Sequence, residues 1–500
     1  MTPAVMFQGT GSDVGKSLIV AGLARLYARQ GLAVRPFKPQ NMSNNAAPAQ
    51  SPGNTWGEIG RAQALQARAA GLTSHTDMNP VLLKPQSDIG AQVVLDGKVV
   101  GNADARAYHE MKPGLLDGVL AAYGRLGSDA DLVLVEGAGS PAEVNLRDGD
   151  IANMGFAEAA DIPVILVGDI ERGGVIAALV GTWALLPAGE RARLAGYIVN
   201  RFRGDTSLFD DALPIIREHT GLDSLGILPW LDAARDLPAE DTASLGARYD
   251  GADWSGAKIR IAVPRLPRIA NFDDLDPLAA EPDVALRLVA PGEAIPGDTQ
   301  LIILCGSKST RADLQALHED GWGKQIAAAA ARGCHVIGIC GGYQMLGHTV
   351  DDPDGVEGAA GRTAGLGLLD VETVITGEKA LKPVTGRSAD TDEQVSGFEM
   401  HMGRTTGPDT ARPFLRLDTG RRPDGAHTPV GQVSGTYVHG VFAADGFRNG
   451  FLKRLNPGRG RGLAWNTQID VVLDRLADHI ESHVDTTRIL EIADRTFRKD

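Results

Sequence analysis

The sequence has few of the residues that mark disulfide-rich, nucleic-acid-binding or membrane proteins. Its 500 residues include three cysteines, Cys305, Cys334 and Cys340, and none has CxxC or metal-finger spacing. A small, odd number of cysteines is typical of proteins in a reducing cytoplasm rather than of disulfide-stabilised proteins. Acidic residues outnumber basic ones by 63 to 49. This balance argues against a general nucleic-acid binder, because phosphates must be neutralised by many cations.

Long apolar runs are also missing. No run reaches the roughly 18 residues needed to span a bilayer. A glycine-rich loop starts at residue 9, which leaves no room for a signal peptide. We therefore expect a cytoplasmic protein without a membrane partner. Because 500 residues exceed what one hydrophobic core usually serves, two domains are expected.

Short apolar runs alternate with helical stretches, which predicts mainly parallel sheets covered by helices. The pattern fades between about residues 231 and 258, and a second α/β series follows. We predict two doubly wound α/β domains, 1–232 and 258–450, joined by a linker at 233–257 and followed by a helical extension at 451–500. In the first half, strands are expected at 4–8, 34–37, 132–135, 164–167 and 194–199, and a helix at 17–30. In the second half, strands are expected at 259–263, 286–289, 301–304 and 335–339, and one helix at 311–332.

A glycine-rich segment, GTGSDVGKS at residues 9–17, lies between the first expected strand and helix. It is one residue longer than a standard P-loop. Its glycines let successive N–H groups face one phosphate, and the helix N-terminus adds partial positive charge. The alternative is a glycine-rich turn with a chance Gly-Lys-Ser. The residues predicted to contact ATP are Gly9, Thr10, Gly11, Asp13, Gly15, Lys16 and Ser17.

A phosphate site of this kind also needs Mg²⁺, which takes a hydroxyl and carboxylates. Ser17 follows the loop lysine and is expected to supply the hydroxyl. Glu136 ends a buried strand, at the edge where doubly wound sheets bind ligands. Glu58, in a Gly-Glu-Ile-Gly segment, is a second candidate acid. The alternatives are a solvated acid at a strand end for Glu136 and an exposed acid in a loop or at a helix start for Glu58.

A polar run, KPQNMSNN at residues 38–45, follows the second expected strand. Its amides offer both hydrogen-bond donors and acceptors. A large substrate that carries several amides and carboxylates would need such groups close to the phosphates. The alternative is a flexible Asn-rich surface loop. The residues predicted to contact this substrate are Lys38, Gln40, Asn41, Asn44 and Asn45.

A second glycine-rich segment, GICGG at residues 338–342, has the pattern of a strand-to-helix elbow that presents a cysteine nucleophile, Cys340. Gly341 and Gly306 are predicted to offer N–H groups to an oxyanion. A cysteine nucleophile needs a base. His439 ends an apolar strand about a hundred residues later and is the first candidate, with His401 as its competitor. Cys305 and Cys334 are expected to be packing residues.

Three features resemble the dethiobiotin synthetase-like group of P-loop enzymes: the longer loop, the Lys38-Pro39 step and the segment VEGAG at 135–139. Members of that group phosphorylate a carboxylate or carbamate. The resemblance implies that Asn200 contacts adenine. The alternative is an ordinary turn residue after a strand. The second half resembles class I glutamine amidotransferase domains, in which a cysteine releases ammonia from glutamine. Their usual acid, two residues after the histidine, is here Val441, which implies a cysteine–histidine pair whose imidazole is less firmly oriented.

In this order the two halves resemble the cobyrinate amidases of corrinoid biosynthesis, and in detail the cobyric acid synthase family. The segments that carry the resemblance lie at 38–45, 168–174, 304–308 and 397–405. It implies ATP-dependent amidation of the four b, d, e and g carboxylates of adenosylcobyrinic acid a,c-diamide. The expected intermediates of this reaction are an acyl phosphate and glutamine-derived ammonia. The ammonia is expected to move between the two sites by a shielded route. The expected partners are therefore corrinoid, glutamine, ATP and Mg²⁺, and the oligomeric state stays open.

Two alternatives remain at this point. One is another enzyme on the same plan, such as a diamide-forming cobyrinate amidase or a cell-wall precursor amidase. The other is a ParA-like switch, in which ATP binding drives dimerisation without amidation. That switch would explain the P-loop but would give no role to Cys340 or His439.

Overall fold

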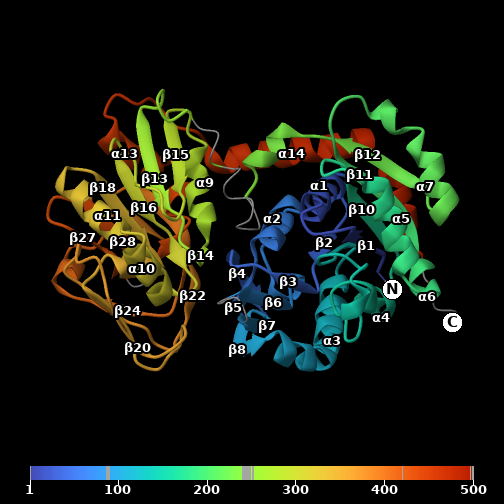
Figure 1. Ribbon diagram of the computed structural model, residues 1–500, viewed down its shortest axis with the longest axis horizontal. Coiled ribbons are helices and arrows are strands. Elements are labelled where there is room, and N and C mark those ends of the chain that lie inside the picture. The colour runs from blue at the N-terminus through green and yellow to red at the C-terminus, as the bar shows by residue number, and fades with distance from the viewer. Residues whose placement is uncertain are drawn as a thin grey trace. The chain divides into compact units, whose positions relative to one another are not determined.

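The computed structural model describes residues 2–85, 90–238, 249, 253–418, 421–495 and 497, with its elements labelled in Figure 1. The chain forms two compact units. The first comprises Met1–Ser43, Ala49–Leu237 and Ile469–Asp500, and the second comprises Asn44–Pro48 and Pro238–Gln468. Residues 239–248 and 250–252 of the predicted linker lie outside the described residues. Within the described ranges, no helix is both long and apolar enough to cross a membrane.

The first unit is built on a six-stranded sheet in the order β12-β11-β10-β1-β9-β2. All neighbouring strands are parallel, as the buried Val and Leu runs predicted. Because the carboxyl ends of these strands share one edge, the loops after β1, β9 and β10 lie together. The strands are β1 (Ala4–Gly9), β2 (Val34–Phe37), β9 (Leu132–Glu136), β10 (Val164–Asp169), β11 (Leu194–Phe202) and β12 (Ser224–Pro229).

Helices cover this sheet (Figure 1). Helices α3 (Ala105–Gly127), α4 (Met154–Ala160), α5 (Val175–Leu185) and α7 (Ala212–Thr220) share one hydrophobic core with it. Helices α1 (Lys16–Arg29), α2 (Arg61–Ala69) and α15 (Thr486–Ala493) pack beside other parts of the sheet or beside one another. A smaller sheet contains β3 (Gln40–Met42), β6 (Val81–Pro85), β7 (Gly90–Leu95) and β8 (Lys98–Asp104), and β4 (Ala46–Ser51) pairs with β5 (Thr55–Gly60).

The C-terminal residues of the chain fold back onto α1. Arg25 forms an ion pair of 2.8 Å with Asp474 of α14 (Trp465–His483). Gly22 faces the same helix, since a Cβ there would lie 2.4 Å from Ile480 Cδ1. Residues 469–500 therefore belong to the first unit, although the strands of that unit end near residue 229.

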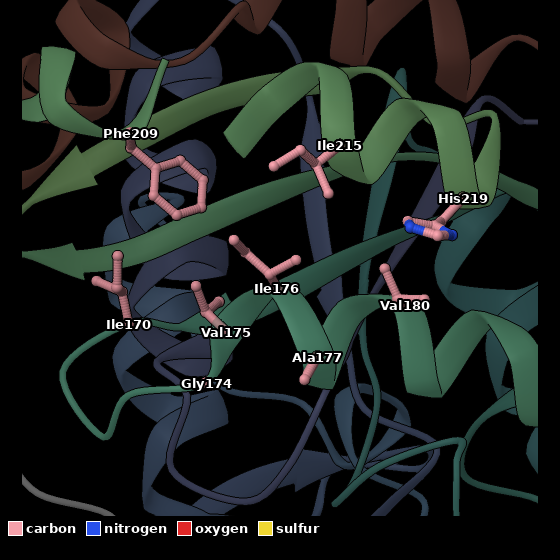
Figure 2. Close-up of a pocket in the computed structure, with 9 residues that line it drawn as sticks. All are labelled: Ile170, Gly174, Val175, Ile176, Ala177, Val180, Phe209, Ile215 and His219. Carbon is pink, nitrogen blue, oxygen red and sulfur yellow. The ribbon is translucent and has the colours of Figure 1, made fainter. Parts of the chain in front are cut away.

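An apolar groove of about 560 Å³ lies between α5 and α7. Figure 2 shows aliphatic side chains of both helices lining it. His219, at its end, is the ionisable residue in the lining. The groove adds no carboxylate, thiol or lysine to the chemistry of the unit. Its lining consists of Ile170, Gly174, Val175, Ile176, Ala177, Val180, Phe209, Ile215 and His219.

The second unit has its own six-stranded sheet, in the order β15-β13-β16-β18-β28-β27. Its strands are parallel except for β27, which pairs antiparallel with β28. The prediction of two doubly wound α/β domains is confirmed. The strands are β13 (Ile259–Pro264), β15 (Val284–Val289), β16 (Leu301–Leu304), β18 (His335–Ile339), β27 (Ala426–His427) and β28 (Val433–Thr436).

The single helix expected at 311–332 is wrong. The structure has two helices, α10 (Thr310–Glu319) and α11 (Trp322–Ala331). Gly321 stands between them with φ of 73°, a left-handed conformation that glycine adopts without a steric penalty. The apolar spacing continues through this turn, and for that reason the sequence pattern concealed the break.

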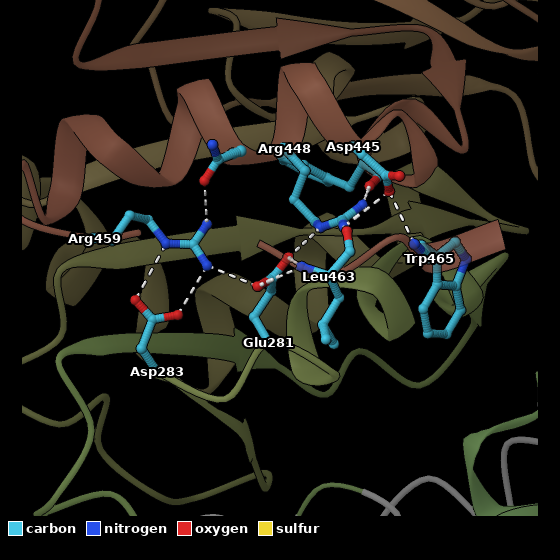
Figure 3. Close-up of polar contacts among 9 residues, drawn as sticks. Glu281, Asp283, Asp445, Arg448, Arg459, Leu463 and Trp465 are labelled. Carbon is cyan, nitrogen blue, oxygen red and sulfur yellow. Dashed lines mark hydrogen bonds and ion pairs between the residues drawn. The ribbon is translucent and has the colours of Figure 1, made fainter. Parts of the chain in front are cut away.

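A buried charge network fixes the end of the second unit (Figure 3). Arg448, on α13 (Asp445–Leu455), is fully buried and donates to Glu281 at 2.7 Å and to the Phe442 carbonyl at 2.8 Å. Arg459 donates to the other oxygen of Glu281, also at 2.7 Å. Breaking such a buried pair leaves an uncompensated charge. The network therefore holds in place the turn that directly follows His439.

Candidate active sites

The phosphate loop has the shape that the sequence predicted. It joins β1 to α1, and Asp13 and Gly15 have φ of 57° and 96°. Asn200 lies near the C-terminal end of β11, and its Nδ2 donates to the Val14 carbonyl at 2.8 Å. A Cβ at Gly15 would lie 2.2 Å from that nitrogen. Glycine is thus required here for two reasons, its positive φ and the close approach of Asn200.

Lys16 and Ser17 begin α1 beside the loop. The Lys16 ammonium donates to the carbonyls of Gly11 and Gly139, each at 3.1 Å, which holds it across the loop. The Ser17 hydroxyl donates to Glu136 Oε1 at 2.7 Å. The structure therefore brings together the three residues predicted to serve the phosphates and the metal, at the carboxyl edge of the sheet.

Glu136 is held by one lysine and two glutamines, and the sequence had singled out only the lysine. Lys38 forms a buried ion pair with it at 2.8 Å. Gln66 donates to its other oxygen at 2.6 Å and Gln63 at 3.4 Å. Both glutamines lie on α2, and nothing in their spacing pointed to Glu136. Asn41 of the polar run donates to Gln63 at 2.8 Å, so the run reaches the same cluster.

The other acid predicted for the metal has a different partner. Glu58, on β5, is fully buried and pairs with Lys84 at 2.8 Å. Ser17 and Glu136 together provide one hydroxyl and one carboxylate, a set that fits Mg²⁺, which keeps waters and phosphates as its remaining ligands. Among the described residues, no group of three or more His, Cys, Asp or Glu has metal-site spacing.

The remaining residues of the polar run divide between the units. Gln40 accepts a hydrogen bond of 2.6 Å from the Tyr108 hydroxyl in the first unit. Asn44 and Asn45 belong to the second unit. There the next residue, Ala46, donates its N–H to Asn271 Oδ1 at 3.2 Å.

Cys340 occupies a strained elbow between β18 and α12 (Gly341–Met345), with φ of 52° and ψ of −109°. Its N–H donates to the Thr436 carbonyl at 2.8 Å, and its Sγ lies 3.4 Å from the Met400 carbonyl. A non-glycine residue in this conformation stores strain that the surrounding packing must support. The residue is 8% exposed, so the thiol lies in a largely enclosed site.

Glycines permit the close packing around the elbow. A Cβ at Gly342 would lie 1.9 Å from the Leu304 carbonyl oxygen, and one at Gly338 would lie 2.4 Å from the Gly342 oxygen. The two glycines predicted for the oxyanion are also near the elbow. Gly341 faces the backbone N–H of Ser307, and Gly306 faces the imidazole of His439, with a hypothetical Cβ 2.9 Å from each.

His439, on β29 (Val438–His439), is buried and interacts with the Cys340 thiol. Its Nδ1 lies 2.7 Å from Asp274 Oδ2, and its ring stacks on Phe398. Burial lowers the pKa of this imidazole, but the negative charge of Asp274 and the contact with Cys340 outweigh burial and raise it to about 10. The imidazole is firmly oriented, contrary to the expectation drawn from Val441.

His401, the competing base, has another environment. Its ring stacks on Tyr437 with centroids 3.8 Å apart, and its Nε2 lies 3.8 Å from Glu399. The other cysteines are packing residues, as expected. Cys305 is fully buried, which raises the pKa of its thiol, and burial raises the pKa of Cys334 to about 11. A raised thiol pKa disfavours the nucleophilic thiolate.

The charge of Glu399 should stabilise the second unit. Burial raises the pKa of this carboxyl, but the interactions with the neighbouring His401 and Arg422 prevail and lower it from 4.5 to about 2. A depressed carboxyl pKa contributes stability above the unfolded value and loses it as the pH falls toward the folded value. Glu399→Gln should therefore lower the melting temperature at pH 7, and this difference should shrink below about pH 4.5.

Thermal melts between about pH 7 and pH 3 would measure this effect. Glu372→Gln serves as the control, because its ion pair with Arg362 is exposed on both sides and such pairs contribute little. A Glu399→Gln deficit that stayed constant over the whole range would contradict the assignment.

Family models match both halves of the chain. Residues 5–245 match the CobQ/CobB/MinD/ParA nucleotide binding domain, and residues 260–447 match the CobB/CobQ-like glutamine amidotransferase domain. Among solved structures, PurLQS from Thermotoga maritima aligns with 43% of this chain and 97% of its own, at 20% identity and a TM-score of 0.30.

Similarity to curated proteins extends over the full length. The cobyric acid synthase of Bradyrhizobium diazoefficiens is 55% identical over 99% of this chain and 100% of its own length. That of Azorhizobium caulinodans is 56% identical over the same shares, and that of Brucella canis 53%. With relatives this similar from end to end, the chain belongs to the cobyric acid synthase family and is a glutamine-dependent amidoligase rather than a ParA-like switch.

Proposed function

We propose that the chain amidates the b, d, e and g carboxylates of adenosylcobyrinic acid a,c-diamide, using ATP and glutamine, to give adenosylcobyric acid. One observation carries the proposal: a chain of this family holds a cysteine–histidine pair in one unit and a lysine–serine–glutamate cluster behind a phosphate loop in the other. The first can release nitrogen from an amide, and the second can activate an acceptor for it.

The nitrogen-releasing step uses Cys340 and His439. The thiolate attacks the side-chain amide carbon of glutamine, and the oxyanion faces the N–H groups near Gly306 and Gly341. The imidazolium gives its proton to the departing ammonia. Water, deprotonated by His439, then attacks the thioester, so that glutamate leaves and the thiolate is restored. The sum is glutamine plus water giving glutamate plus ammonia.

The acceptor step uses the phosphate loop. Lys16 and the N–H groups of Gly9, Thr10, Gly11, Asp13 and Gly15 would hold the phosphates, and Asn200 would contact the adenine. A corrin carboxylate attacks the terminal phosphorus and ADP leaves, which gives an acyl phosphate. Ammonia then displaces phosphate to form the amide. Mg²⁺ would offset the phosphate charge, with Ser17 and Glu136 as its protein ligands and Glu58 as a further candidate.

The polar run supplies the substrate contacts of this proposal. Lys38 pairs with Glu136 and Asn41 with Gln63 of the same cluster, Gln40 accepts a hydrogen bond from Tyr108, and Asn44 and Asn45 follow them in the sequence. We assign the acceptor step to residues 1–232 and the glutaminase step to residues 258–450, with 451–500 as a helical extension. A cytoplasmic location, with no nucleic-acid or membrane partner, also stays a prediction.

Product mass tests this proposal. The purified chain should convert the corrin diamide, with ATP, Mg²⁺ and glutamine, through four successive products, each with one OH replaced by NH₂. Omission of ATP should stop every step. A product that gains only the a and c amides from cobyrinic acid, or amidation of a cell-wall precursor in place of the corrinoid, would contradict the substrate assignment.

A further inference from the structure

We infer that Asp274 is the positioning residue of the glutaminase site, the carboxylate that fixes the His439 imidazole for its work on Cys340. The inference rests on the proposed glutaminase function and adds a third residue to it. Asp274 precedes His439 by 165 positions, and the usual location of such an acid, two residues after the histidine, holds the buried Val441.

The two carboxylate oxygens of Asp274 contact two consecutive residues, His439 and Gly440. Oδ2 lies 2.7 Å from His439 Nδ1, and Oδ1 accepts the Gly440 N–H at 2.5 Å. The two side chains are 2% and 3% exposed, so water competes little for these bonds. Two contacts fix the plane of the carboxylate against the end of β29. The proton is therefore placed on Nδ1, the Cε1–Nε2 edge of the ring faces Gly306, and the ring interacts with the Cys340 thiol.

The turn that carries Asp274 is itself tied to the oxyanion region. Its entry strand β14 (Ile269–Ala270) pairs antiparallel with β17 (Gly306–Ser307), with Ala270 opposite Gly306. Asn271 then takes a left-handed conformation, φ 52°, and its carbonyl accepts the Asp274 N–H at 3.2 Å. One short loop thus holds Gly306 through backbone pairing and His439 through a carboxylate.

Charge gives Asp274 a second effect. An imidazolium in a buried site is costly unless a negative group lies beside it. The carboxylate of Asp274 meets that requirement, and it opposes the effect of burial on the His439 pKa. The carboxylate therefore favours the thiolate–imidazolium form of the pair, which is the form that attacks an amide and then protonates ammonia.

Asp274→Asn tests both effects in the full-length chain. It keeps the side-chain size but removes the charge, and it presents an N–H or a neutral oxygen to Nδ1. Glutaminase kcat should fall about 100-fold, less than for a serine-protease triad because a thiol is more acidic than a hydroxyl, while KM for glutamine changes little. The alkaline limb of kcat/KM should move to lower pH, because the His439 pKa falls.

Matched variants separate positioning from folding. Asp273→Asn, one residue earlier in the same turn, should leave the pH profile in place. Asp274→Glu, which restores the charge, should recover part of kcat. Amidation with ammonium chloride should stay near the wild-type rate in all three, because that route bypasses the thiol. Equal loss of the ammonia-dependent and glutamine-dependent rates in Asp274→Glu, or an unchanged pH profile in Asp274→Asn, would overturn the inference.

Alkylation of Cys340 by iodoacetamide gives a reading that does not depend on the proposed function. Peptide mass spectrometry distinguishes this cysteine from Cys305 and Cys334. The alkylation rate of Cys340 at pH 7 should fall in Asp274→Asn and rise again at higher pH. An identical pH dependence in wild type and variant would contradict the role of Asp274, whereas wild-type protein that released no glutamate would contradict only the proposed function.

Discussion

Cys340→Ala should abolish glutamine-dependent amidation while ammonia-dependent amidation continues. The thiol forms the covalent intermediate, and no other described side chain at the elbow can replace it, so glutamine hydrolysis should fall at least about 1,000-fold. Ammonia reaches the acyl phosphate without that step. Glutamate release and product formation, measured with glutamine or with ammonium chloride, would separate the two routes.

Cys334→Ala is the matched control for this variant. Cys334 is buried directly before β18, outside the elbow, and burial disfavours its thiolate. Both routes should survive in it. Continued glutamine-dependent synthesis in Cys340→Ala would show that nitrogen is released elsewhere.

Lys16→Ala should have the opposite pattern. It should lose amidation from both nitrogen sources, because an uncompensated terminal phosphate is a poor electrophile, and the loss should be about 100- to 1,000-fold. Glutaminase activity should remain, since Cys340 and His439 lie in the other unit. Trapping of the acyl phosphate with hydroxylamine, together with ADP release, would measure the affected step.

Lys98→Ala is a suitable control, because Lys98 is an exposed residue at the start of β8. Hydroxamate formation should be normal in that variant. Full acyl phosphate formation in Lys16→Ala would contradict the role given to the phosphate loop.

The sequence predicted the parts of the molecule that depend on local pattern. Continuous apolar runs located the strands at 132–135, 164–167 and 335–339, because a strand buried on both faces must be apolar throughout. The glycines around Lys16 and Cys340 located both loops, because close packing, and at Gly15 also a positive φ, excludes larger residues there. The two-domain α/β fold followed from these features, and the family resemblance followed from the segments at 38–45, 168–174, 304–308 and 397–405.

The parts that the sequence did not reveal depend on contacts between distant residues. Asp274 approaches His439 only after the sheet has formed, and an Asp in a Phe-Asp-Asp-Leu segment has no distinguishing local pattern. The same holds for Gln66, whose partner Glu136 lies 70 residues away. Glu58 was only a candidate metal ligand, named for its place in a Gly-Glu-Ile-Gly segment, and its buried partner Lys84 was not apparent.

Incorporation of amide-¹⁵N from glutamine shows directly whether Cys340 supplies the nitrogen of the new amides. Wild-type protein with ATP and the corrin diamide should place ¹⁵N in each new amide, detected by NMR, with one glutamate released per amide. Excess unlabelled ammonium should dilute that label poorly. An amidated product without ¹⁵N, or transfer of the label by Cys340→Ala, would rule out this division of labour between the two sites.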